Sequence, residues 1–350
     1  MCYNTGMTKR IGFACKWIDE PRQVNGIKPK DDCRKYNTGG TTVAWLNRQT
    51  REVAEQKLWD LLEYNIEATR LLIERVGTLD EQLRMVRLSS DILPAYTEPN
   101  WSYFWGGTDV VAYAERHFAR IGELARANNV RLSMHPGQFT VLASDNADIV
   151  DRSIDEFEYH TDMARWMGYG NGWHDHGFKI NVHISGRRGP AGILAALPRL
   201  SPESRNLITI ENDENSWGID ASLELADHVA LVLDVHHHLI NTGGQYIQPD
   251  DERCKRIWES WRGVRPVIHY SISREDVLTG HDPEVLPDVR QLLESKTTNK
   301  TKLRAHSDDT WNLASNRWVL QFLPHADIQV ESKWKNISSR RLWQQHLDGV

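Results

Sequence analysis

The sequence predicts a single (β/α)8 barrel with long loops at the end of the barrel where the strands finish. Strand and helix patterns alternate along the 350 residues, eight strand candidates can be counted, and six of these end on a side chain that can bind a metal. Alternating β and α elements favour a parallel sheet, and a closed eight-stranded barrel uses a chain of this length in one domain. We therefore expect residues 1–9 to be a loose leader and residues 10–350 to form one barrel domain.

The predicted elements follow one another in a regular order. Strands are expected in short apolar runs at 10–15, 85–90, 131–135, 179–184, 207–211, 229–234, 266–270 and 328–332. Helices are expected at 50–76, 108–128, 146–167, 219–227, 252–262 and 336–347, where the patterns fit helical spacing. Three long loops, at 16–48, 91–107 and 271–310, each follow a strand. Loops of this length either bind something large or are insertions.

Six strand candidates share one arrangement of side chains. Each ends on a residue type that binds metals, and these residues are His135, His183, Glu211, Asp234, His269 and Glu331. Alternate residues of a strand face the same side, so each of the six shares a face with the residue two places before it. The intervening residue is apolar in all six strands. We expect the first face to point into the barrel and the apolar face to pack under helices.

These six positions indicate a multinuclear metal centre. A lone His or Glu at a strand end is more often a structural residue, but six equivalent positions are not independent accidents. The carboxyl ends of barrel strands are where enzymes of this fold carry their chemistry. Three imidazoles and three carboxylates suit Mn, Zn or Fe better than a cysteine-based structural zinc.

The composition is that of an ordinary globular protein, with 40% hydrophobic and 26% charged residues. The net charge of −6 does not favour a nucleic-acid substrate. Three divalent ions would bring that charge to about zero, and Lys296, Lys300, Lys302 and Arg304 form a local basic tract. The net charge therefore argues neither for nor against a nucleic-acid substrate. Most of the 14 tryptophans are expected in the core, with a minority on loops able to stack on bases.

The cysteines and the apolar runs bear on the compartment. Cys2, Cys15, Cys33 and Cys254 form no CxxC pair, and we expect reduced thiols in a cytoplasmic protein. No apolar stretch approaches the ~18 residues of a membrane span, and the first residues lack the apolar core of a signal peptide.

A Pro-Gly turn directly follows the third predicted strand. Pro136 and Gly137 force a sharp bend after His135, so Gln138 and Phe139 would project from the rim of the barrel. A polar and aromatic pair on a rigid turn could wedge into a base stack. If this motif is considered alone, the simpler interpretation is that Phe139 is a loop aromatic that caps the barrel.

At this point the chain resembles the UV damage endonuclease family, from about Arg10 to Lys335. Eight motifs carry the resemblance and occur in the family's order. They are Arg87–Pro94, Leu132–Phe139, Val182–Gly186, Glu211–Glu214, Asp234–His238, His269–Ser271, Arg304–Asp308 and Val330–Lys333. The resemblance implies a barrel related to endonuclease IV, a manganese-type metal cluster, and cleavage of the DNA strand 5′ to pyrimidine photoproducts.

The resemblance also implies a role for each ligand candidate. It implies that Glu211 bridges two metals. One of these metals also takes His135 and His183, and the other takes Asp234, His269 and Glu331. His237 and His306 would help to hold a third metal. DNA contacts are expected from Gln138, Phe139, Trp105, Lys300, Lys302 and Lys333.

Two positions depart from the family's pattern. Phe139 stands in the family's probing wedge where Tyr is usual, which keeps stacking but removes one hydrogen bond. Val267 stands where family members usually have a Lys that can be carboxylated to become a ligand, and Val cannot ligate. We therefore expect two to three divalent ions, with Mn2+ the first choice and the third site weaker than the other two.

The strand-end ligands predict a metal-dependent enzyme, and the resemblance implies an endonuclease that nicks damaged duplex DNA 5′ to UV photoproducts, for which we expect 3′-hydroxyl and 5′-phosphate ends. We expect a monomer that needs no obligate protein partner and no membrane. Three alternatives stay open: an abasic-site endonuclease of the endonuclease IV type, a metal-dependent sugar isomerase or epimerase on the same kind of barrel, and a non-catalytic lesion-binding protein.

Overall fold

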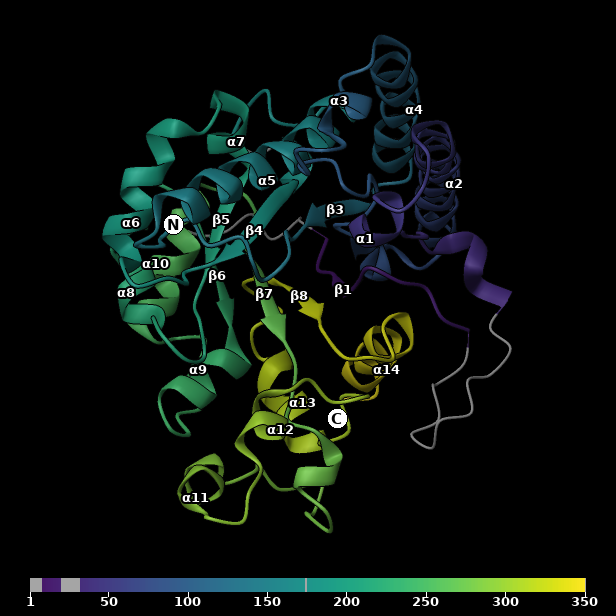
Figure 1. The fold of residues 1–350 in the computed structure, drawn as a ribbon. Coiled ribbons are helices and arrows are strands. Elements are labelled where there is room, and N and C mark those ends of the chain that lie inside the picture. The colour runs from purple at the N-terminus through teal and green to yellow at the C-terminus, as the bar shows by residue number, and fades with distance from the viewer. Residues whose placement is uncertain (1–7, 20–31, 174, 350) are drawn as a thin grey trace.

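The computed structural model describes residues 8–19, 32–173 and 175–349. Eight parallel strands pair in chain order and close into a barrel, with β8 beside β1 (Figure 1). The strands are β1 Ile11–Ala14, β2 Met85–Arg87, β3 Arg131–Met134, β4 Lys179–His183, β5 Ile208–Glu211, β6 Ala230–Asp234, β7 Val267–Tyr270 and β8 Asp327–Val330. The predicted barrel and all eight predicted strands are confirmed. Residues 1–7 of the expected leader, and Cys2 with them, lie outside the described residues.

The helices lie around the outside of the barrel (Figure 1). Those of six or more residues are α2 Arg51–Gly77, α4 Thr108–Ala127, α5 Ala147–Trp166, α6 Gly189–Ala196, α7 Pro202–Leu207, α9 Val235–Asn241, α10 Glu252–Ser260, α11 Val289–Glu294, α13 Leu313–Leu320 and α14 Asn336–Leu347. Shorter ones are α1 Val43–Leu46, α3 Ser102–Trp105, α8 Ile219–Leu223 and α12 Lys300–Arg304. Single 3-10 turns are η1 Asp32–Tyr36, η2 Glu81–Leu83, η3 Asp175–Gly177, η4 Leu197–Arg199 and η5 Glu275–Val277. Within the described ranges no helix combines the length and apolarity needed to cross a membrane.

Several helices were not predicted from the sequence, and each has a local reason. α6 begins with Gly-Pro-Ala-Gly and shows no helical spacing of apolar residues. α9 starts directly after β6, because the side chain of Asp234 caps it by accepting from the backbone N–H of His237. The helices predicted at 219–227 and 252–262 are present but end earlier, at Leu223 and Ser260.

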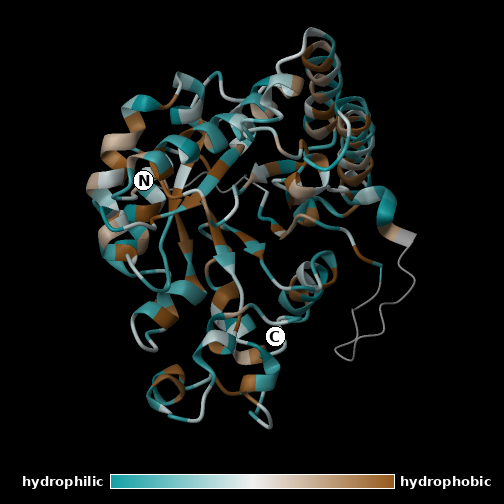
Figure 2. Ribbon diagram, in the orientation of Figure 1, coloured by the Kyte–Doolittle hydropathy of each residue, from teal (hydrophilic) through white to brown (hydrophobic). Residues whose placement is uncertain are grey.

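The two faces of the strands divide as the alternation predicted. Met134, Val182, Ile210, Leu233, Ile268 and Val330 are all buried in one apolar core between the barrel and its helices. Figure 2 shows the corresponding hydrophobic segments along the strands. The inward face is largely polar: Asn181, Thr209 and Gln329 are almost fully buried within the barrel. Most of the buried tryptophans also belong to the apolar core, as expected, and Cys15, Cys33 and Cys254 are free thiols.

An ion-pair network closes the end of the barrel where the strands begin. Asp327, with no exposed surface, accepts from Nη1 of Arg131 at 2.8 Å and from the backbone N–H of Arg10 at 2.8 Å. Arg265 pairs with the same carboxylate from the loop before β7. This layer joins β3 and β8 to the residues just before β1 and β7, at the end of the barrel opposite the site.

Candidate metal centre

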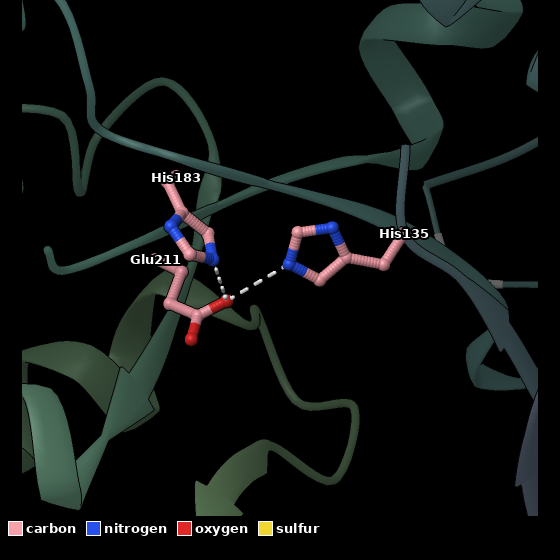
Figure 3. Close-up of side chains that lie close together, drawn as sticks. All are labelled: His135, His183 and Glu211. Atoms are coloured by element: carbon pink, nitrogen blue, oxygen red, sulfur yellow. Dashed lines mark ion pairs between the residues drawn. The ribbon is translucent and has the colours of Figure 1, made fainter. Parts of the chain in front are cut away.

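Side chains from the ends of five strands converge at the open end of the barrel. Two groups have ligand atoms that all lie within 4.8 Å of one another: His135, His183 and Glu211 form the first group, and Glu211, Asp234 and His269 form the second. Figure 3 shows the first group, in which both imidazoles face one carboxylate oxygen. The parallel register places these strand ends side by side, with His183 paired to Glu211 and Asp234 paired to His269.

Glu211 faces the two groups with different oxygens. Its Oε2 lies 3.4 Å from Nε2 of His135 and 3.5 Å from Nε2 of His183, while its Oε1 lies 3.0 Å from Nδ1 of His269. The side chain is fully buried. Burial would raise the pKa of Glu211, but the surrounding histidines hold it well below its usual range. The carboxylate is therefore ionised, and one oxygen is available to each group.

A polar chain within the barrel supports Glu211 from below. Asn181, two residues before His183 on β4, donates a hydrogen bond from Nδ2 to Oε2 of Glu211. The hydroxyl of Thr209, two residues before Glu211 on β5, donates to Oδ1 of Asn181 at 2.9 Å. These contacts fix the orientation of the carboxylate, because both partners are rigidly placed on neighbouring strands.

Each histidine of the first group has its second ring nitrogen next to an acceptor. Nδ1 of His135 lies 2.8 Å from the carbonyl oxygen of Pro136, and Nδ1 of His183 lies 3.7 Å from Oδ2 of Asp213. Asp213 is itself held by the backbone N–H groups of Asn215 and Ser216, each at 2.8 Å. Acceptors of this kind commonly orient metal-ligating histidines. Burial lowers the pKa of His135 to about 4, so its ring is neutral near pH 7 and Nε2 can ligate.

Asp234 is held by its own helix cap. Its Oδ1 accepts from the backbone N–H of His237 at 2.7 Å, and the Asn212 side chain hydrogen-bonds both to its backbone N–H and to its carbonyl. Burial raises the pKa of Asp234 to about 7, and the nearby Glu211 and Glu331 carboxylates add to the effect. A cation beside Asp234 would reverse this effect, because it favours the ionised form.

The donor atoms of the second group fit a divalent cation. Oδ2 of Asp234 is buried and has no hydrogen-bond partner among the described residues, and Oε1 of Glu211 and Nδ1 of His269, also buried, lie 3.0 Å apart without the geometry of a hydrogen bond. Buried polar atoms without a partner are costly, and these three residues each have a ligand atom within 4.8 Å of the others. A bound metal would satisfy all three. Mixed imidazole and carboxylate ligands suit Mn, Zn or Fe.

Glu331 lies at the edge of the second group and is paired with an arginine. Its Oε1 forms an ion pair with Nη1 of Arg87 and lies 3.6 Å from Nδ1 of His269, while its Oε2 lies 3.8 Å from Nε2 of His306. Arg87 was not among the predicted site residues. Its position as the last residue of β2 follows the same rule as the ligands and could have identified it.

The residues expected at a third metal site lie close to the other two groups. His237 has Nδ1 at 3.0 Å from the Asn212 carbonyl and 3.4 Å from Oε1 of Glu211. Together with His306 it lines a cavity of about 410 Å3, whose wall also includes His135, His183, Gln138, Asp213, Glu214 and Arg304. Val267 packs against an apolar cluster of Ala230, Val232 and Trp261, so the inner wall at this position offers no ligand.

The expected DNA-contacting residues are not equally placed to reach a ligand. Phe139 is 85% exposed, and Gln138 lines the cavity. Lys300 is exposed, whereas Lys302 is paired with Asp276 and Lys333 with Asp308, each at 2.7 Å.

Trp105 requires a correction. It is 2% exposed and packs against Tyr96 and Phe104, so it belongs to the core beneath its loop and is not placed to stack on a base. Two other aromatic residues of the same segment also pack inward, Phe104 against Trp59 of α2 and Tyr96 against Tyr159 of α5, whereas Tyr103 is 43% exposed.

The family model described as UV-endonuclease UvdE matches residues 10–349. The UV DNA damage endonuclease of Bacillus mycoides (strain KBAB4) is 27% identical over 326 residues, covering 89% of each chain. That of Bacillus thuringiensis subsp. konkukian (strain 97-27) is 25% identical over 319 residues, covering 88% of each chain.

Two solved structures share the fold. The crystal structure of SacUVDE matches with a TM-score of 0.68 at 20% identity, covering 97% of this chain and 99% of that one. Endonuclease IV from Thermus thermophilus matches with a TM-score of 0.52 at 14% identity, covering 80% and 94% of the two chains.

Proposed function

The chain belongs to the UV-endonuclease UvdE family, and on that premise we propose that it nicks duplex DNA 5′ to UV photoproducts with the help of divalent metals, leaving 3′-hydroxyl and 5′-phosphate ends. The observation that carries the metal dependence is Glu211, whose two oxygens face two separate ligand groups. Paired ligand groups of this kind suit the two-metal hydrolysis of phosphodiesters.

Each of the two ligand groups would hold one metal ion. His135 and His183 would hold one ion with Glu211, and Asp234 and His269 would hold the other with Glu211, with Glu331 beside it. When bound, such ions supply Lewis acidity toward a phosphate and acidify a water. We propose Mn2+ as the ion, because the ligand set combines nitrogen and oxygen donors without sulfur.

The protein's own residues would prepare the substrate. Phe139 and Gln138 stand on a turn at the rim, where an exposed aromatic can enter a base stack that a photoproduct has already weakened. Arg304 lines the cavity beside the centre and would contact a phosphate without reading sequence. Asp213 and Asn181 would hold His183 and Glu211 in place while the strand is cut. We propose that the protein does this as a monomer.

A nicking assay on defined duplexes tests the proposal. The purified protein is chelated, and Mn2+ is then added back to duplexes carrying one photoproduct, one abasic site or no lesion. We expect metal-restored nicking on the 5′ side of the photoproduct, with a ligatable 3′-hydroxyl. Cleavage of the abasic duplex alone would favour the abasic-site alternative, and lesion binding without cleavage would favour a non-catalytic role.

A further inference from the structure

The ends of β1, β2 and β8 lie at one level of the barrel. Ala14 pairs with Arg87 of β2, and Phe13 pairs with Val330 of β8. Ala14 therefore has Arg87 on one side and, on the other, the strand end that leads into Glu331. Phe13 belongs to the outer apolar core, and alternate residues of a strand face opposite sides, so Ala14 faces the barrel interior. A side chain this small does not separate its two longer neighbours.

Arg87 reaches Glu331 across the end of β1. Neighbouring strands are about 4.8 Å apart, so the backbones of β2 and β8 are about 10 Å apart, a distance that an arginine and a glutamate cover together. Nη1 of Arg87 forms an ion pair with Oε1 of Glu331, and the two side chains are only 15% and 7% exposed. Opposite charges attract more strongly in such a place than at the surface. The ion pair therefore determines where the Glu331 carboxylate points.

The Glu331 oxygen that Arg87 holds is also the one that faces the second ligand group. Oε1 of Glu331 lies 3.6 Å from Nδ1 of His269, whereas Oε2 lies 3.8 Å from Nε2 of His306. Asp234 differs, because its Oδ2 has no hydrogen-bond partner among the described residues. Within the same part of the chain, Glu331 belongs to neither group of ligand atoms that lie within 4.8 Å of one another. A metal in the second group would have to compete with the guanidinium for Oε1.

We propose that Arg87 is a positioning residue that keeps Glu331 from acting as a full ligand of the second metal ion. This inference rests on the proposed function and changes the part that Glu331 has in it. Glu211, Asp234 and His269 hold the ion, and Glu331 stays paired with the arginine. An ion with one anionic ligand fewer keeps more of its charge for an oxygen of the substrate. The guanidinium also places a like charge beside the ion, which weakens metal binding.

The test measures Mn2+ binding without the Arg87 charge. Chelated samples of the unaltered protein, Arg87→Met and Arg84→Met are titrated with Mn2+ in a calorimeter. Arg87→Met frees Oε1 of Glu331 and removes a like charge, so the product of the first two binding constants should rise at least about tenfold, the scale of one charged hydrogen bond. Arg84→Met is the matched control and should leave this product unchanged. Arg84 precedes the other end of the same strand, where it donates to the backbone carbonyls of Leu79 and Asn128.

A double variant tests whether Arg87 acts through Glu331. Arg87→Met combined with Glu331→Gln replaces a cation and an anion by a neutral pair of similar size, so neither charge is left buried alone. Because the net charge beside the ion is unchanged, this variant should bind Mn2+ within about threefold of the unaltered protein. A gain equal to that of Arg87→Met alone would show that the arginine acts only by its own charge. A loss of about tenfold or more would show that Glu331 is a full ligand. Either result would overturn the proposal.

Melting temperatures separate this role from a purely structural one. A structural role would lower the melting temperature of Arg87→Met equally with and without Mn2+. The proposal instead predicts that Mn2+ stabilises Arg87→Met more than it stabilises the unaltered protein, and unchanged or weaker Mn2+ binding by Arg87→Met would overturn it. The readouts do not depend on nicking. A protein that shows the Arg87 effect but does not cut photoproduct duplexes would refute the proposed function and keep this inference, and normal cutting without the Arg87 effect would do the reverse.

Discussion

At the scale of single residues, Glu211 carries the largest share of the proposed chemistry. It is buried, ionised and placed between two sets of imidazoles, with one oxygen turned toward each. No neighbouring carboxylate could replace it without a shift of the backbone, because Asp234 and Glu331 come from other strands and have partners of their own.

We predict that Glu211→Gln keeps the fold and loses most metal-dependent nicking, because an amide bears no charge and bridges two cations poorly. The amount of bound metal and the nicking activity should decrease together. Glu214→Gln is the matched control: it also neutralises a carboxylate of the cavity wall, but one outside both ligand groups, so it should retain far more metal. A folded Glu211→Gln protein that binds metal and nicks normally would contradict the bridging role.

Phe139 is exposed to a degree that core packing does not explain. We predict that Phe139→Ala reduces the preference for photoproduct over intact duplex by about 1–3 kcal/mol, the scale of one base–aromatic stacking contact, with metal content unchanged. Phe139→Tyr should keep the preference. Binding to both duplexes is measured side by side, and Tyr64→Ala, an exposed aromatic on α2, should have no effect. An unaltered preference in Phe139→Ala would make Phe139 an ordinary rim aromatic.

The pKa of Asp234, raised to about 7 by burial and by Glu211 and Glu331, sets the direction of a pH effect. Below that pKa the carboxylate of the metal-free protein holds a proton, which must leave before a metal can bind. Mn2+ affinity should therefore fall as the pH is lowered from about 8 to about 6. Calorimetric titrations at the two values check this, and equal affinities would show that Asp234 is not a ligand.

At the scale of elements, the strands determine where the ligand side chains lie relative to one another. The parallel register brings the ligands together at the carboxyl ends of the strands. Within the barrel, Asn181 donates a hydrogen bond to Glu211, and Thr209 donates one to Asn181. The ion-pair layer around Asp327 holds the other end of the same strands.

We predict that Asp327→Ala destabilises the protein by about 3–5 kcal/mol, because it leaves the buried Arg131 and the half-buried Arg265 without their carboxylate partner. Urea unfolding followed by circular dichroism measures the loss. Asp348→Ala, which removes an exposed carboxylate near the end of the chain, should cost little. A small effect of Asp327→Ala would mean that water or a rearranged contact replaces the carboxylate.

The same elements show what the sequence could and could not predict. The strand ends were found because each apolar run finishes on a ligand type, a signal confined to a few adjacent residues. Arg87 escaped notice because arginine is not a ligand type, and the role of Asp213 depends on a loop conformation that places it beside His183. Trp105 was misplaced because an aromatic residue in a loop gives no information on whether the loop folds down onto the core. The short helices α6 and α9 lack the periodic pattern that identifies longer ones.

At the scale of the whole molecule, the contacts that stabilise the barrel and the residues of the proposed reaction lie in different regions. The buried ion pairs and the apolar core hold the closed end and the outer layer, while the open end gathers carboxylates, imidazoles and the Arg87 guanidinium. The long segments after β2 and β7 follow strand ends that carry the site, which suits a substrate as large as duplex DNA. The net charge of −6 would be offset locally if the proposed divalent ions bind where the strand would be cut.

Counting the metals tests the central claim, that two ions share Glu211, most directly. Chelated protein is titrated with Mn2+, and the bound metal is followed by elemental analysis and by electron paramagnetic resonance. Two ions should bind tightly and give the spectrum of a coupled pair, with a third binding only at higher concentration because Val267 offers no ligand near His237 and His306. One isolated ion per chain, or three ions of equal affinity, would contradict the account.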